Sequence, residues 1–231
     1  MRLAKEMEIK EMKYYSKDWY KEMQLYSFLN FPDTKEEWDE TIKYFESNGK
    51  DYIKNLKKDL EFFKNDLLKF LPESFHSYIN DGTLNTAYPS EKLRNMINNW
   101  KDEYDQQMED LNKEYRSKYN ASKDLLPLSI VKLNEISLHD SNVKSIENLS
   151  IDTFVINLDC AGGFNDFTEI KLTFKGVKEI SMPEDIKGGF WLYDEVYPAK
   201  SGFELHVLFD IPFIEFKIVA EDIIVEGKSD N

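Results

Sequence analysis

The chain has 231 residues, of which 30 are basic and 44 acidic, so its formal net charge at pH 7 is −14. Hydrophobic residues make up 41% of the chain, enough to form a core, which excludes a collagen-like or largely disordered protein. Phosphate contacts need clustered cations, so this charge also argues against binding of nucleic acid through a basic face. The single cysteine, Cys160, cannot form an internal disulfide, the N-terminus is charged throughout, and no apolar run could span a membrane. We therefore expect a soluble, cytoplasmic protein.

Apolar residues recur at helical spacing through the first half of the chain. Four helices are predicted: one begins after Ser16, one after a capping box at Thr34, one covers about 51–71, and one begins after Ser90. Pro72 ends the third helix or begins a short further turn. The last helix could continue for about 30 residues, a length that allows a coiled coil or a partner-binding helix. Packing along a bundle is favoured, because its heptad pattern is neither strict nor long.

From residue 129 on, apolar residues alternate or form short runs rich in Val, Ile and Phe, which is typical of strands. The links between them are too short for crossover helices, so a mainly antiparallel β-sandwich or small barrel is expected. Eight strands are predicted, at residues 130–138, 142–147, 151–158, 168–174, 190–197, 203–209, 213–220 and 223–225.

These patterns predict an α+β protein with two domains. Residues 1–128 would form an N-terminal helical bundle of about four helices, and residues 129–231 an all-β domain. The helical half holds 21 basic and 25 acidic residues, a net charge of −4, whereas the β half holds 9 and 19, a net charge of −10. Most of the negative charge therefore belongs to the predicted β-domain.

Several short motifs are spread along the chain. They are Met12–Tyr20 (MKYYSKDWY), Asp81–Leu84 (DGTL), Tyr88–Ser90 (YPS), Leu138–Asp140 (LHD), Gly162–Phe164 (GGF), Trp191–Tyr197 (WLYDEVY) and Glu204–Leu208 (ELHVL). Together they resemble the bacterial family catalogued as domain of unknown function 4085, over nearly the whole chain from Met12 on. Residues 1–11 would then be an extension or the product of an early start codon. The resemblance implies no activity, substrate or catalytic residue, because none is established for the family. The Leu-His-Asp motif also resembles the opening of small β-rich immunity-type modules found beside bacterial toxins.

Few residues suggest chemistry. The three histidines, His76, His139 and His206, have no metal-ligand spacing, and there is no phosphate loop or nucleophile elbow, so neither a cofactor nor a metal is expected. Cys160 could act as a nucleophile with His139 or His206 as its base, but a small core residue is favoured. The segment 159–166 is predicted to be a glycine-rich turn rather than a Ca²⁺ loop. Enzyme activity is left uncertain, and the balance lies against it.

The best candidate site lies on a predicted hairpin of residues 190–209. With a five-residue loop, Glu195 would pair with Leu205 and Asp194 would lie opposite His206. Glu195 would either be a carboxylate in an aromatic pocket or be satisfied by tyrosine hydroxyls and backbone donors at a core edge; the second interpretation is favoured. The candidate binding residues are Trp191, Tyr193, Asp194, Glu195, Tyr197 and His206, with His139 and Asp140.

Three functions remain open, in order of preference. The first is a non-enzymatic binding or immunity-type module whose acidic β-domain meets a basic protein partner. The second is a small-molecule-binding or enzymatic module that uses the region of Trp191–Tyr197 and His206. The third is a structural subunit that assembles through the helix at residues 90–119. Acidity alone is a weak argument for the first, since it also serves solubility.

Overall fold

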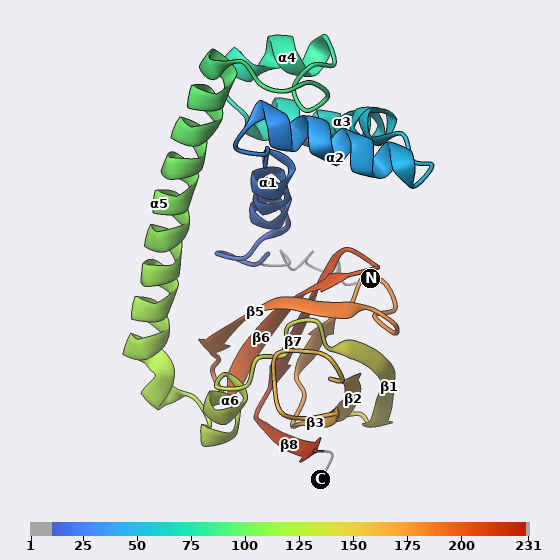
Figure 1. Cartoon of the computed structure of the whole chain (residues 1–231). Helices are drawn as coiled ribbons and strands as arrows, with labels where there is room; N and C mark the ends of the chain where they lie inside the picture. The colour runs from blue at the N-terminus through green and yellow to red at the C-terminus, as the bar shows by residue number, and fades with distance from the viewer. Residues whose placement is uncertain (1–10, 230–231) are drawn as a thin grey trace, which may run out of the picture. The chain divides into compact units, whose positions relative to one another are not determined.

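The computed structural model describes residues 11–229, which form two compact units (Figure 1). The helical unit contains residues 18–110, and the sheet unit joins residues 11–17 to residues 111–229. The division falls within the long helix α5 (Glu91–Ser122). The predicted domain boundary lies between residues 128 and 129. It separates segments expected to fold independently, and it stays a prediction. The expected extension at residues 1–11 lies outside the described residues except for Glu11.

The helices of the helical unit begin and end where local side chains satisfy their backbone groups. Thr34 Oγ1 accepts the N–H of Glu37 at 3.1 Å and the Glu37 carboxylate accepts the N–H of Thr34, which confirms the predicted capping box. Ser90 Oγ accepts the N–H of Leu93 at 3.2 Å, as predicted. The bounds are α1 Lys17–Phe28, α2 Lys35–Ser47, α3 Tyr52–Phe70, a 3₁₀ turn at Glu73–Phe75, α4 His76–Asn80 and α5 Glu91–Ser122.

The core of the helical unit is formed by one apolar stripe from each of several helices. Buried leucines of α3 and the apolar residues of the first half of α5 recur three, four or seven residues apart, the spacing of one helix face. The fully or nearly buried members of this core are Leu25, Leu29, Leu60, Leu67, Leu71, Phe75, Ile79, Leu84, Leu93, Ile97, Trp100 and Tyr104.

The sheet unit contains one eight-stranded antiparallel sheet, in the order β4-β7-β6-β5-β1-β2-β3-β8. The predicted antiparallel arrangement is therefore confirmed, but the sheet is not closed, so the predicted small barrel is wrong. The bounds are β1 Asn142–Ser150, β2 Thr153–Asp159, β3 Glu169–Lys175, β4 Glu179–Ser181, β5 Phe190–Pro198, β6 Phe203–Asp210, β7 Ile214–Ala220 and β8 Asp222–Lys228.

The sheet consists of two four-stranded halves, β4-β7-β6-β5 and β1-β2-β3-β8, that pair with each other only at Asn142 and Phe190. Both halves contribute to one apolar core. The ring of Phe154 on β2 stacks on that of Phe216 on β7 at 6.1 Å, although three strands separate these two in the sheet. The inner face of each half is thus covered by the other, and the outer faces are left for polar residues.

The predicted element count is wrong in two places. Residues 11–229 contain six α-helices rather than about four, because α4 and α6 (Leu128–Leu133) were not predicted as helices. The strand expected at 130–138 is wrong, because its first residues belong to α6. Ile130 and Leu133, three residues apart, both face the core. In so short a segment the spacing of apolar residues does not distinguish a strand from a helix. The three-residue strand β4 was missed for the same reason. No helix of the described chain is both long and apolar enough to cross a membrane.

Candidate functional site

The β5–β6 hairpin has a different register from the predicted one. Pro198 pairs with Phe203, so the loop has four residues and not five, and Glu195, rather than Asp194, lies opposite His206. The tight loop depends on Gly202, at φ +84°, where an added Cβ would lie 2.1 Å from the carbonyl oxygen of Ala220. The predicted pairs of Asp194 with His206 and of Glu195 with Leu205 are therefore wrong.

A bulge between Trp191 and Tyr193 separates residues that the sequence placed on one face. Trp191 still pairs with Phe209, as predicted, and the edge-to-face contact of the two rings at 5.5 Å is part of the core. Tyr193 and Glu195 instead belong to the outer face. Trp191 is 1% exposed and packs in the core, so it lies apart from the outer-face members of the predicted cluster.

Glu195 has no exposed surface, and its carboxylate binds the backbone of the N-terminal segment. Its Oε1 accepts the N–H groups of Tyr14 at 2.6 Å and Tyr15 at 2.7 Å. Its Oε2 accepts the N–H of Lys13 at 2.9 Å and the hydroxyl of Tyr197 at 2.5 Å. These four hydrogen bonds compensate for the loss of water around the buried carboxylate. We call residues 12–15 the N-terminal strap. The donors to the Glu195 carboxylate, backbone N–H groups and a tyrosine hydroxyl, are of the kind that the favoured interpretation specified.

Tyrosines fix the N-terminal strap against the end of α5 that belongs to the sheet unit. The ring of Tyr15 lies 5.5 Å from that of Tyr193 and 5.4 Å from that of Tyr115, and its hydroxyl donates to Asn112 Oδ1 at 2.9 Å. Burial, with the nearby charge of Glu195, raises the pKa of Tyr15 to about 12. This phenol therefore stays protonated near neutral pH and serves as a donor rather than as a base.

Asp194 points away from Glu195 and accepts the indole N–H of Trp191 at 3.0 Å. Desolvation by burial, reinforced by the charge of Glu195, raises the pKa of Asp194 from 3.8 to about 6, against the opposing effect of the Trp191 hydrogen bond. The carboxyl of Asp194 is thus an acid whose charge changes just below neutral pH. It lies on the inner side of the strand and does not pair with His206.

His206 begins a chain of polar and charged groups across the outer face. Its Nε2 lies 2.6 Å from Glu204 Oε1, and Lys217 Nζ lies 3.8 Å from Glu204 Oε2 and 3.0 Å from Glu179 Oε1. His206 is 2% exposed and Lys217 9%, so both are buried, whereas the side chains of Glu204 and Glu179 are 22% and 34% exposed. Neither Glu204 nor Lys217 was among the predicted site residues, because their roles follow from the cross-strand register.

A cavity of about 490 Å³ lies beside this chain. Tyr197, Glu204 and His206 form part of its wall, together with Pro198 and with Glu11 and Lys13 on either side of Met12. Tyr197 and Glu204 are direct cross-strand partners, so an aromatic ring and a carboxylate lie side by side in the wall. Two of the predicted residues, Tyr197 and His206, are thus brought into one cavity.

His139 contacts Tyr193 and, like Asp140, is not among the residues that line the cavity. The ring of His139 lies between those of Phe164 at 5.5 Å and Tyr193 at 5.2 Å. Its Nδ1 is 3.1 Å from Asp140 Oδ1, without the geometry of a hydrogen bond. Cys160 is 1% exposed and belongs to the core cluster. Across residues 11–229, no group of three or more His, Cys, Asp or Glu side chains could hold a metal ion.

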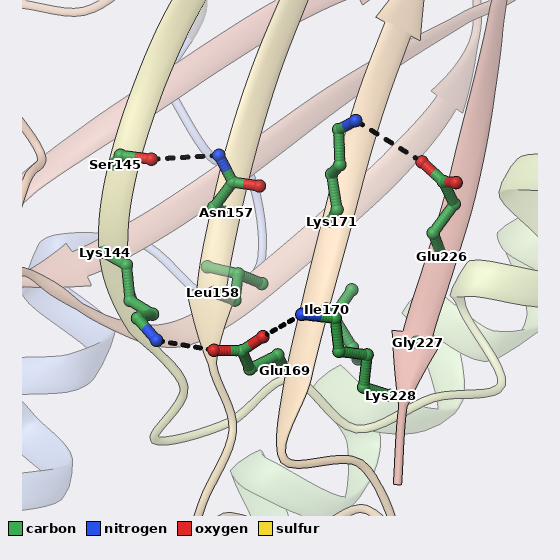
Figure 2. Close-up of a pocket in the computed structure, with 10 residues that line it drawn as sticks. All are labelled: Lys144, Ser145, Asn157, Leu158, Glu169, Ile170, Lys171, Glu226, Gly227 and Lys228. Carbon is green, nitrogen blue, oxygen red and sulfur yellow. Dashed lines mark hydrogen bonds and ion pairs between the residues drawn. The ribbon is translucent and has the colours of Figure 1, made fainter.

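A second cavity of about 490 Å³ lies on the outer face of β1-β2-β3-β8 (Figure 2). Glu169 accepts from Lys144 and Lys228 Nζ, each at 2.6 Å, and Lys171 pairs with Glu226 at 3.6 Å. The hydrogen bonds and charges of Lys144 and Lys228 lower the pKa of Glu169 to about 2. Each of the three lysines that line this cavity contacts one of its two carboxylates, Glu169 or Glu226.

The fold and the site define an α+β protein whose open antiparallel sheet carries, on one outer face, the buried carboxylate of Glu195 and a cavity lined by Tyr197, Glu204 and His206. A family model described as "Protein of unknown function (DUF4085)" matches residues 14–220, and the chain belongs to this family. The predicted resemblance is thereby confirmed, with the match beginning at Tyr14 rather than Met12. No curated protein matches the chain.

Proposed function

We propose that the chain is a non-enzymatic binding protein that meets a basic partner on the outer face of β4-β7-β6-β5. The observation that carries the proposal is the pairing of the Tyr197 ring with the Glu204 carboxylate in the wall of the 490 Å³ cavity. A carboxylate next to an aromatic face is an arrangement that binds ammonium and guanidinium groups.

The charges of this face support a cationic partner. Four carboxylates, those of Glu179, Glu195, Glu204 and Glu215, share it with the ammonium group of Lys217. Glu195 and Glu215 are engaged by backbone N–H groups of the N-terminal strap. The carboxylates that line the cavity are those of Glu11 and of Glu204, and Glu204 already contacts His206 and Lys217. Such a face steers a basic surface toward itself and repels an acidic one.

Calorimetric titration with a hexa-arginine peptide tests the proposal. Glu204→Gln removes the charge at the cavity, and Glu147→Gln on β1 removes one exposed charge from the other half of the sheet as a matched control. We expect Glu204→Gln to weaken binding about fivefold, the effect of one partly screened charge pair of about 1 kcal/mol, and the control to leave it unchanged. Equal weakening by both variants, or no saturable binding, would contradict the proposal.

The cavity also favours a second function, the binding of a small molecule at Tyr197 and His206. Its volume of about 490 Å³ lies within the range of ligand pockets. A screen of neutral aromatic compounds, read from the side-chain NMR signals of His206, separates the two functions. Saturable shifts with neutral compounds and none with hexa-arginine would support the small molecule over the basic partner.

We also propose that the protein is cytoplasmic, as its composition predicts. An immunity-type role, in which the basic partner is a toxin, is a narrower form of the first function. Inhibition of a basic toxin encoded beside this chain's gene would support it, and the absence of any such neighbour would contradict it.

A further inference from the structure

A cavity of about 250 Å³ in the helical unit lies between the first half of α5 and the segment that follows α1. Arg94 and Lys101 of α5 both line it, seven residues or two helical turns apart and therefore on one face of the helix. The loop supplies Phe31 and Pro32, and α5 adds Ile97, so the cavity has an apolar wall beside two cationic groups.

Neutral groups hold the guanidinium of Arg94 in place. Nη1 donates to the carbonyl oxygen of Asp33 at 2.7 Å, Nη2 donates to the hydroxyl of Tyr88, and the guanidinium lies 4.8 Å from the centre of the Tyr88 ring. These two hydrogen bonds use two of its five donors. The group is thus fixed in position and retains donors for a further acceptor.

The ammonium group of Lys101 is held in the same way. It donates to Asn30 Oδ1 at 2.5 Å and lies 4.6 Å from the centre of the Tyr26 ring. Burial lowers the pKa of Lys101, and the charge of Asp105 on the same helix only partly opposes this effect. A bound anion would relieve the cost of keeping this ammonium charged.

The two cations differ in one respect from those of the cavity in Figure 2, where each lysine forms an ion pair with a carboxylate of the lining. Among residues 11–229, no carboxylate forms an ion pair with Arg94 or Lys101. The cavity lining includes one acidic residue, Asp33, and it contacts Arg94 through its backbone carbonyl. In a chain with 44 acidic residues, two partly buried cations without a carboxylate partner leave an acceptor to be supplied from outside.

We propose that this cavity binds a small oxyanion, a carboxylate or phosphate group attached to an apolar body. Arg94 would bind two oxygens of the group through its planar fork, and Lys101 would neutralise it as a point charge. The apolar body would lie on Phe31, Pro32 and Ile97. The inference is independent of the proposed function, because its residues all belong to the helical unit.

Titration of the full chain followed by NMR tests the inference, with the side-chain amide signals of Asn30 and Asn98 as reporters. Inorganic phosphate is the first probe, acetate the second, and benzoate adds an apolar body to the carboxylate. We expect saturable shifts with phosphate or with acetate, and the probe that gives them identifies the preferred oxyanion. We also expect benzoate to bind more tightly than acetate.

Two variants keep the fold while they alter the site. Arg94→Lys retains the charge but loses the planar fork, and Lys101→Met retains the apolar stem but loses the charge. Lys92→Met, an exposed position on the same helix, is the matched control. We expect at least tenfold weaker binding in both site variants, with unchanged melting temperatures, and wild-type binding in the control. Absence of saturable shifts with any probe would overturn the inference, as would equal weakening by Lys92→Met.

Discussion

Replacement of Asp194 by asparagine should make the protein more stable at neutral pH. The pKa of Asp194 rises from 3.8 to about 6 on folding, so the folded chain binds its proton more tightly than the unfolded chain. Stability from this group is complete below pH 4 and is lost as the pH rises through 6. A difference of about two pKa units corresponds to at most about 3 kcal/mol, at 1.36 kcal/mol for each unit. Asparagine has no charge to desolvate and keeps an oxygen for the indole N–H of Trp191.

Urea unfolding of both proteins at pH 4, 5.5, 7 and 8 measures this difference. The other titrating groups are common to the two chains, so subtraction of the two curves isolates Asp194. We expect the advantage of Asp194→Asn to be absent at pH 4 and to grow to between 1 and about 3 kcal/mol at pH 7 and above. A difference that does not change with pH, or a variant less stable than wild type at pH 7, would refute the reasoning.

Four further substitutions test other parts of the structure by their effect on the free energy of unfolding. Glu195→Gln puts an amide N–H₂ against donors of the N-terminal strap and should cost about 3 kcal/mol, whereas an unchanged melting curve would remove the structural role of this carboxylate. Gly202→Ala, where the new Cβ would lie 2.1 Å from the carbonyl oxygen of Ala220, should cost more than about 3 kcal/mol. Gly188→Ala has a similar φ of +82° in open space and should cost only about 1 kcal/mol; equal losses at the two glycines would contradict the steric argument. Thr34→Ala removes one bond of the capping box and should cost about 1 kcal/mol in thermal unfolding.

Most of the fold could be predicted because its signals are local. Helix α2 follows from a capping box at Thr34 and ends at Asn48-Gly49, and strand β3 alternates cleanly between inward and outward residues. Helix α6 could not be predicted in the same way, since Ile130 and Val131 have strand propensity and its helical period spans fewer than two turns. Closure of the sheet depends on whether the edge strands β4 and β8 meet, which no local pattern specifies.

The candidate site could be predicted in composition but not in geometry. A hairpin brings Glu195, Tyr197 and His206 together, as the sequence predicts, but a four-residue loop and a bulge give them different cross-strand partners from the predicted ones. Three of the four donors to Glu195 are backbone N–H groups some 180 residues away in sequence, and a backbone group carries no residue-specific signal. Tyr14 and Tyr15, which carry those groups, were visible only as part of a motif.

The most direct test of the central claim, that a cation binds between Tyr197 and Glu204, is an NMR titration with N-acetyl-arginine amide, which presents one guanidinium. The account predicts saturable shifts in the side-chain signals of Tyr197 and His206, and their loss in Glu204→Gln. Saturable shifts confined to other residues, with those two signals unmoved, would contradict it.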